Sequence, residues 1–154
     1  MAQAVATQLA RGAAMGVRLK FDSAGTQSLR GRPVIDPRAR AVLKQAGYEA
    51  GAHRARRVTP QDLAANDLIL AMDAGHLETL RDVCGPEHAH KLRLFLDFAP
   101  GLEGHDVPDP YFGDAGGFAR VLALCEAGVR GLLAAAPGLP GEAPRNGLRD
   151  PCAG

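Results

Sequence analysis

The stretch "DLILAMD" (67–73) decides the fold class of this chain. It is a compact apolar run that ends on an acidic residue, which is typical of a buried strand. The next segment, "AGHLETLRDVCG" (74–85), has the apolar spacing of a helix, and "KLRLFLDF" (91–98) indicates another strand. A strand, a helix and a strand in this order predict a parallel sheet with a right-handed crossover.

The same alternation continues on both sides of this unit. Residues 2–14 predict a helix, and "VRLKFDSAG" (17–25) alternates apolar side chains as a strand does. Two further helices are expected after the capping signals at Asp36 and Thr59, each of which precedes a proline. Residues 117–136 form a strong amphipathic pattern. We therefore expect a three-layer α/β fold, a small parallel sheet flanked by helices.

Composition limits the classes of function. The chain has 154 residues, enough for one domain with a core, and its net charge of +1 gives no field that would favour nucleic acid. No apolar run reaches the roughly 18 residues of a membrane span, and no signal peptide opens the chain. We expect a cytoplasmic protein with one domain over 1–136 and a disordered tail over 137–154.

The three cysteines do not form a recognisable site. Cys84, Cys125 and Cys152 are odd in number and far apart, and none lies in a C-x-x-C motif, so neither a disulfide framework nor a zinc site is expected. Cys125 lies in an apolar helical pattern and is expected to be a buried hydrophobe. Nucleotide-binding glycine motifs are absent as well. The sequence therefore implies no metal and no organic cofactor.

A long loop holds the most conspicuous acidic residues. The stretch "VPDPYFGD" (107–114) lies in an irregular segment of nearly twenty residues, a length typical of functional or disordered loops. Asp109 is either the first residue of an Asp-Pro turn or a general acid. Asp106, three residues earlier, is the alternative candidate for the general acid. Because this loop, "DSAGT" and "MDAGH" each follow an expected strand, we expect them to gather at the carboxyl edge of the sheet.

Five motifs in order resemble the low-molecular-weight protein tyrosine phosphatases: "FDSAGT", "DPRARAVLKQAG", "HRARRVTPQD", "DLILAMD" and "DVPDPYFG". The resemblance covers about residues 1–135. It implies a four-stranded parallel sheet in the order 2-1-3-4 and hydrolysis of phosphotyrosine through a phosphocysteine. In that family a C-x5-R-S loop carries the nucleophile, and its N–H groups hold the phosphate at a helix N-terminus.

The resemblance assigns roles to six residues of this chain. Asp109 matches the general acid/base. Leu29 and Phe112 depart from the aromatic residue and the tyrosine that relatives often carry there. The other assignments are a supporting network under the phosphate loop and the walls of the pocket: Ser23 and His53 for the network, and Leu29, Tyr111 and Phe112 for the walls.

No cysteine of this chain matches the nucleophile. The C-x5-R-S signature would precede the helix over 2–14, and the residue six positions after Cys84 is His90, whereas the one after Cys125 is Gly131. Either the true gene product is longer and Met1 is an internal methionine, or this is a truncated relative. We expect residues 1–154 to be inactive on phosphotyrosine, and to be poorly soluble or to close up the sheet where the central first strand is missing.

Simpler roles stand beside several of these assignments. Ser23 would otherwise cap a strand end, and His53 would be an ordinary surface or core residue. Asp73 is either a supporting residue or a helix N-cap. Arg56 and Arg57 form either a basic rim for phosphate or a solvated face.

Two other functions remain open at this point. A thiol-linked arsenate reductase shares the fold but would need the same missing nucleophile and two redox cysteines a few residues apart. A remnant that binds a partner or phosphate without catalysis is the non-enzyme alternative. If the phosphate loop were present, the partner would be a phosphotyrosine protein or a small phosphate ester, with no nucleic acid and no membrane.

Overall fold

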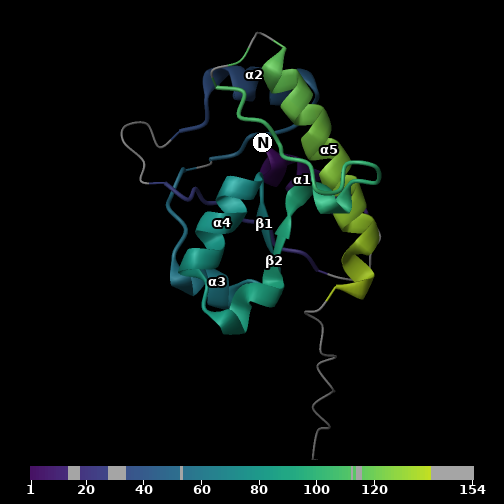
Figure 1. The fold of residues 1–154 in the computed structure, drawn as a ribbon. Coiled ribbons are helices and arrows are strands. Elements are labelled where there is room, and N and C mark those ends of the chain that lie inside the picture. The colour runs from purple at the N-terminus through teal and green to yellow at the C-terminus, as the bar shows by residue number, and fades with distance from the viewer. Residues whose placement is uncertain (14–17, 28–33, 53, 112, 114–115, 140–154) are drawn as a thin grey trace, which may run out of the picture.

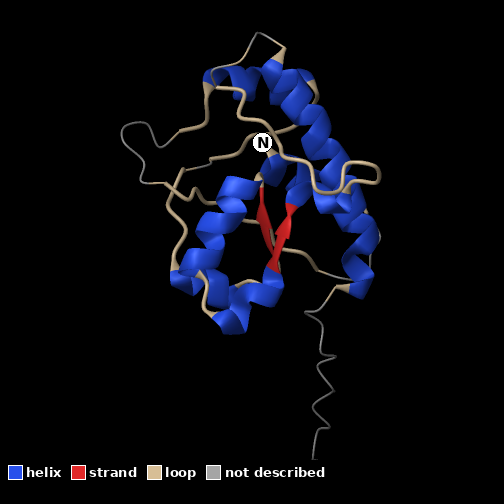
Figure 2. Cartoon of the chain, viewed as in Figure 1, coloured by secondary structure: helices blue, strands red, loops and turns tan. Residues whose placement is uncertain are grey.

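The sheet consists of two short parallel strands. A computed structural model of the chain describes residues 1–13, 18–27, 34–52, 54–111, 113 and 116–139. In these residues β1 (Ile69–Ala71) pairs with β2 (Leu92–Leu94), with Ile69 opposite Leu92. The helix α4 (Ala74–Val83) and the 3₁₀ helix η1 (Pro86–Lys91) connect them. Figure 2 shows the pair at the centre of a largely helical protein. The predicted strand–helix–strand unit is confirmed.

Helices cover both faces of this pair, which confirms the α/β class. On one face, Ala71 and Leu92 pack with α4 and with α3 (Pro60–Ala65) in a small buried cluster. On the other, Leu70 packs against a larger cluster contributed mainly by α1 (Ala2–Gly12) and α5 (Gly117–Ala135). Successive strand residues thus point to opposite layers, as a strand's period of two requires. Figure 1 shows α3 and α4 on one side of the strands and α5 on the other.

The capping signals are confirmed at three helices. The Asp36 carboxylate accepts the Arg38 N–H at the start of α2 (Pro37–Gln45). Thr59 forms a reciprocal capping box with Asp62 at α3. Asp73 accepts the His76 N–H, 2.6 Å away, at the start of α4. Each side chain satisfies amide groups that the first turn of a helix leaves without partners.

The strand expected over 17–25 is not formed in the part that the structure describes. Residues 18–24 have no regular structure, and Gly25 makes a single parallel bridge with Arg57. In the described residues no ladder joins this segment to β1, so a closed-up sheet is not seen, whereas the alternative expectation of poor solubility stays a prediction. The resemblance places a first strand between this segment and β1, and no strand of the described residues lies there. A strand without a hydrogen-bonding neighbour has no ladder to stabilise it.

The second strand is also shorter than expected. It ends at Leu94, and Phe95–Phe98 turn into the 3₁₀ helix η2, where an Asp97 carboxylate oxygen accepts the Leu94 N–H. The turn lies tightly against α5, because a Cβ added at Gly128 would be 2.5 Å from Phe95 Cε1 and one added at Gly131 would collide with the Phe98 carbonyl oxygen. Glycine at these positions permits the close approach.

The end of the described chain lies just beyond α5. A 3₁₀ helix, η3 (Ala136–Gly138), follows it, so the first residues of the expected tail are helical. Residues 140–154 lie outside the described residues, and the disorder of the tail stays a prediction. Among the helices that the structure describes, none is long and apolar enough to cross a membrane.

Candidate active site

The loop that carries Asp109 is attached to the carboxyl end of β1. The Val107 N–H donates to the Met72 carbonyl oxygen at 2.7 Å, directly after the strand. The Ala74 N–H donates to Asp106 Oδ1 at 2.9 Å, at the start of α4. The expected gathering at this edge thus holds for this loop and for the start of α4. Asp106 acts here as a partner for the first turn of a helix.

Asp109 forms the turn that its sequence predicts. Its Oδ1 accepts the Tyr111 N–H at 2.9 Å, and the Gly113 N–H donates to the Pro110 carbonyl oxygen at 3.2 Å. The carboxylate is exposed. A side chain bonded to the backbone two residues on is held in a defined direction. The turn role of Asp109 is therefore confirmed, and it leaves an accessible carboxylate at this edge.

An arginine that sequence reasoning missed holds the same loop. Arg38, at the start of α2, places its guanidinium 5.3 Å from the Tyr111 ring centre and 4.6 Å from that of Phe118. It donates to the Tyr111 carbonyl oxygen at 3.3 Å and pairs with Asp36 at 2.9 Å. Hydrogen bonds from Arg38 hold the pKa of the Asp36 carboxyl below its usual value. The "DPR" motif was interpreted only as a helix start.

Ser23 is tied to helix α1. Its hydroxyl donates to Gln3 Oε1 at 2.6 Å, and Gln3 Nε2 donates to the Phe21 carbonyl oxygen at 3.3 Å. Gln3 therefore fixes the Ser23 segment next to the first turn of α1. Sequence reasoning named Ser23 without this partner. The structure holds Ser23 and Asp109 through different elements.

Arg56 is the centre of an ion-pair network, whereas its part in a phosphate rim stays a prediction. Its guanidinium bonds Asp22 at 2.6 Å and Asp62 at 2.7 Å. Hydrogen bonds from Arg56 are the main cause that lowers the pKa of Asp62 to about 2. Arg57 is exposed beside it. The network joins the Asp22–Ser23 segment to the start of α3.

Replacing Arg56 by glutamine should lower stability in a pH-dependent manner. The pKa of Asp62 is about 2 in the fold against an ordinary 3.8, so its ion pair stabilises the fold above about pH 4 and is lost as pH falls toward 2. The urea midpoint of Arg56→Gln should lie below that of the unmodified chain at pH 6, and the two should converge near pH 2. Arg57→Gln is the matched control and should follow the unmodified chain. A constant gap over this range would contradict the assignment.

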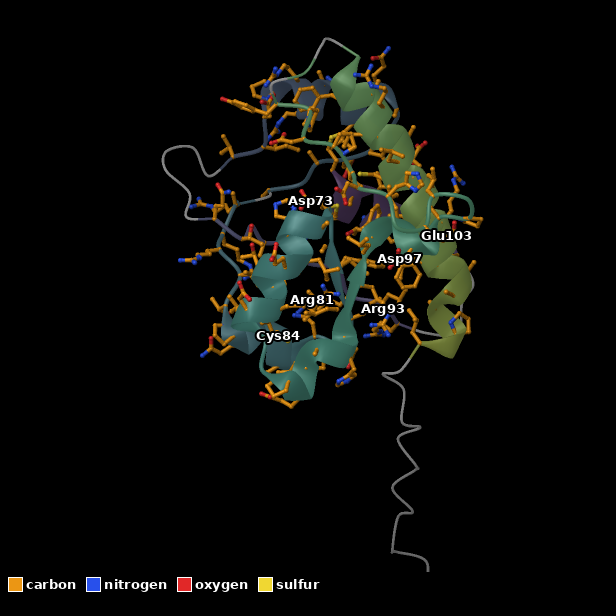
Figure 3. The ribbon with its side chains drawn as sticks, in the orientation of Figure 1. Asp73, Arg81, Cys84, Arg93, Asp97 and Glu103 are labelled. Atoms are coloured by element: carbon orange, nitrogen blue, oxygen red, sulfur yellow. The ribbon has the colours of Figure 1, made fainter. Side chains whose placement is uncertain are left out.

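Cys84 lies away from the Asp109 edge, and Cys125 is buried. Asp73 and Cys84 lie at opposite ends of α4 (Figure 3), so Cys84 is far from the carboxyl end of β1. Cys125 is buried in α5, and burial raises the pKa of its thiol to about 11. Cys125 is thus a buried hydrophobe, as expected, whereas the absence of a nucleophile stays a prediction. In the described ranges, no group of three or more His, Cys, Asp or Glu side chains could hold a metal.

Three of the assigned residues fall outside the described part of the chain: Leu29, His53 and Phe112. Their roles stay predictions. Tyr111 is described and is 57% exposed, so its ring lies at the surface of the loop beside Asp109.

Comparison with known proteins decides the family. The profile of the family described as "Low molecular weight phosphotyrosine protein phosphatase" matches residues 1–137. The chain belongs to the low-molecular-weight protein tyrosine phosphatases. A family member from Streptomyces coelicolor is 41% identical over 138 residues, which are 88% of this chain and 84% of the relative. Phosphatase A of Mycobacterium tuberculosis is 37% identical and matches 86% of this chain and 80% of its own length.

Solved structures agree with this family. A protein tyrosine phosphatase from Entamoeba histolytica superposes with a TM-score of 0.82 at 31% identity, covering 89% of this chain and 87% of that one. A low-molecular-weight phosphotyrosine phosphatase from Vibrio cholerae has a TM-score of 0.81 at 33% identity, covering 88% and 86%. The phosphatase fold is thus recognisable although the described sheet has only two strands.

Proposed function

We propose that this chain carries the acid/base half of a phosphotyrosine phosphatase site, with Asp109 as the proton donor. The observation that supports this most is the attachment of the Asp109 loop to the carboxyl end of β1 through the bond from Val107 to Met72. Ligand sites of open α/β sheets lie outside this edge. The turn at Tyr111 orients the carboxylate, and solvent reaches it.

The chemistry assigned to Asp109 follows from the two steps of the family reaction. A cysteine thiolate forms a bond to phosphorus, and the bond from phosphorus to the phenolic oxygen breaks. Asp109 gives its proton to that oxygen, so tyrosine leaves as a neutral phenol. Asp109 then takes a proton from water as the water oxygen attacks the phosphocysteine, which releases phosphate and the thiolate.

Other residues have supporting roles in this proposal. Helix α1 begins at Ala2 without a side chain that caps it, and the first N–H groups of a helix favour a phosphate dianion. Ser23, held by Gln3, lies beside that first turn and supports the phosphate loop together with His53. Leu29, Tyr111 and Phe112 are proposed to wall the pocket.

The nucleophile is the part that residues 1–154 do not supply. None of the three cysteines is followed by arginine six residues on, Cys84 lies at the opposite end of α4 from Asp73, and Cys125 is buried. We infer that the 154-residue polypeptide does not turn over phosphotyrosine. Joining a C-x5-R loop ahead of Met1 should supply the missing groups.

The substrate class and location complete the proposal. We propose a phosphotyrosine protein or a small aryl phosphate as substrate, in the cytoplasm, where the free thiols Cys84 and Cys125 are expected to stay reduced. An arsenate reductase has no support, because Cys84 and Cys125 pack in different hydrophobic clusters and cannot act as a close redox pair.

Hydrolysis of phosphotyrosine tests the proposal. The comparison is between residues 1–154 alone and a chimera in which the residues that precede the matching region of the Streptomyces coelicolor relative are joined ahead of Met1. We expect turnover only from the chimera.

A further inference from the structure

We propose that Arg38 is a positioning residue that immobilises Tyr111 and thereby orients the Asp109 carboxylate. This inference rests on the proposed function in one respect, which is that Asp109 is the proton donor. Its structural content is that a residue on α2 restricts the motion of Tyr111.

The first observation is the double ring contact of Arg38. Its guanidinium carbon is 4.6 Å from the Phe118 ring centre and 5.3 Å from the Tyr111 ring centre. Phe118 is 5% exposed and belongs to α5, whereas Tyr111 is 57% exposed and belongs to the loop. The cation connects the exposed ring to a buried one through the attraction between a cation and the face of an aromatic ring.

The second observation is that Arg38 itself is held firmly. Asp36 accepts from Arg38 Nε at 3.1 Å and from Nη2 at 2.9 Å, one bond to each carboxylate oxygen. The same Asp36 caps α2 by accepting the Arg38 N–H at 2.8 Å. Two parallel bonds fix the plane of a guanidinium as well as its position. Arg38 is therefore a rigid support for the loop.

The third observation joins Arg38 to Asp109 through one residue. Arg38 Nη1 donates to the Tyr111 carbonyl oxygen at 3.3 Å, while the Tyr111 N–H donates to Asp109 Oδ1 at 2.9 Å. Both bonds act on the backbone of Tyr111. If Arg38 is removed, Tyr111 loses the ring contact and the carbonyl hydrogen bond that Arg38 provides, and the bond that directs the carboxylate loses that support.

Lysine cannot replace arginine in this arrangement. The guanidinium forms two parallel bonds to Asp36, stacks on rings and still has an N–H for the Tyr111 carbonyl, whereas an ammonium group is a compact point charge. Arg38→Lys keeps the positive charge, and its ammonium group can still form an ion pair with Asp36. It therefore separates positioning by a planar group from simple charge attraction.

Tyrosine fluorescence measures the motion of Tyr111 directly. The chain has two tyrosines and no tryptophan, so Tyr48→Phe leaves Tyr111 as the only emitting residue. In this background we expect the time-resolved anisotropy of Tyr111 to show little fast motion. Arg38→Ala and Arg38→Lys should both add a large fast component and raise acrylamide quenching toward that of N-acetyltyrosinamide. Arg40→Ala, at an exposed arginine of the same helix, should change neither.

Far-UV circular dichroism shows whether each variant is folded. If Arg38→Ala does not fold, Arg38→Gln replaces it in the anisotropy measurement. Unchanged anisotropy in a folded Arg38→Ala or Arg38→Gln protein would overturn the proposal. Full immobility in Arg38→Lys would also overturn it, because charge would then be sufficient. The measurement needs no catalysis, so a failure of the proposed function and a failure of this inference are distinguishable.

Discussion

Gly131→Ala should cause a large loss of stability. The added methyl group would collide with the Phe98 carbonyl oxygen, a backbone atom of η2 that cannot rotate away as a side chain could. Helix α5 would have to move off η2, which carries the buried Phe95 and Leu96. Overpacking typically costs about 1–3 kcal/mol and sometimes more, and backbone contact places this variant at the upper end. Urea unfolding followed by circular dichroism measures the loss.

Gly12→Ala is the matched control. Gly12 is also helical, at the end of α1, and no atom lies within 4 Å of its added Cβ. Alanine is preferred over glycine in helices, so we expect unchanged or higher stability, by up to about 0.5–1 kcal/mol. If Gly131→Ala were as harmless as Gly12→Ala, the close packing of α5 on η2 would be contradicted.

Asp109→Asn should cause the largest loss of activity in the chimera that carries a phosphate loop. An amide cannot donate the proton that the leaving phenolate needs, and general acid catalysis contributes about 10²–10⁴-fold. The side chain keeps an oxygen to accept the Tyr111 N–H, so the turn should survive. We expect kcat for phosphotyrosine to fall by this factor with little change in KM. With 4-nitrophenyl phosphate, whose leaving group needs less protonation, the loss should be smaller.

Asp106→Asn in the same chimera is the control for this assignment. Asp106 Oδ1 accepts the Ala74 N–H, and the oxygen of asparagine can do the same. We therefore expect nearly unchanged kcat. If Asp106→Asn instead lost activity and Asp109→Asn kept it, the two aspartates would have exchanged roles and the assignment would be wrong.

Local signals in the sequence predict those parts of the fold that local chemistry determines. The caps at Asp36, Thr59 and Asp73 follow from short side chains that bond to amide groups two or three residues away. The segment over 17–25 also has a clear local pattern, but a strand needs a neighbour far along the chain. In the described structure this segment has a single bridge, at Gly25. The alternating pattern alone is therefore not sufficient to form a strand.

The residues of the candidate site also divide into those with a local signal in the sequence and those whose partners are distant. Asp109 was found because the Asp-Pro turn and the ordered motifs both involve it. Arg38, Gln3 and Asp22 were missed because their partners lie far away in the sequence, at Tyr111, Ser23 and Arg56 respectively. A long-range ion pair or ring contact leaves no spacing signal in a single sequence. Only the folded backbone brings such groups together.

The account depends most directly on which polypeptide can hydrolyse phosphotyrosine. Purified residues 1–154 should release no phosphate above the buffer rate. The chimera, assayed at the same concentration, should turn over and should accumulate a phosphocysteine when stopped with acid. Turnover by residues 1–154 that is abolished by Cys84→Ser or Cys125→Ser would contradict the account, because a nucleophile would then lie within this chain.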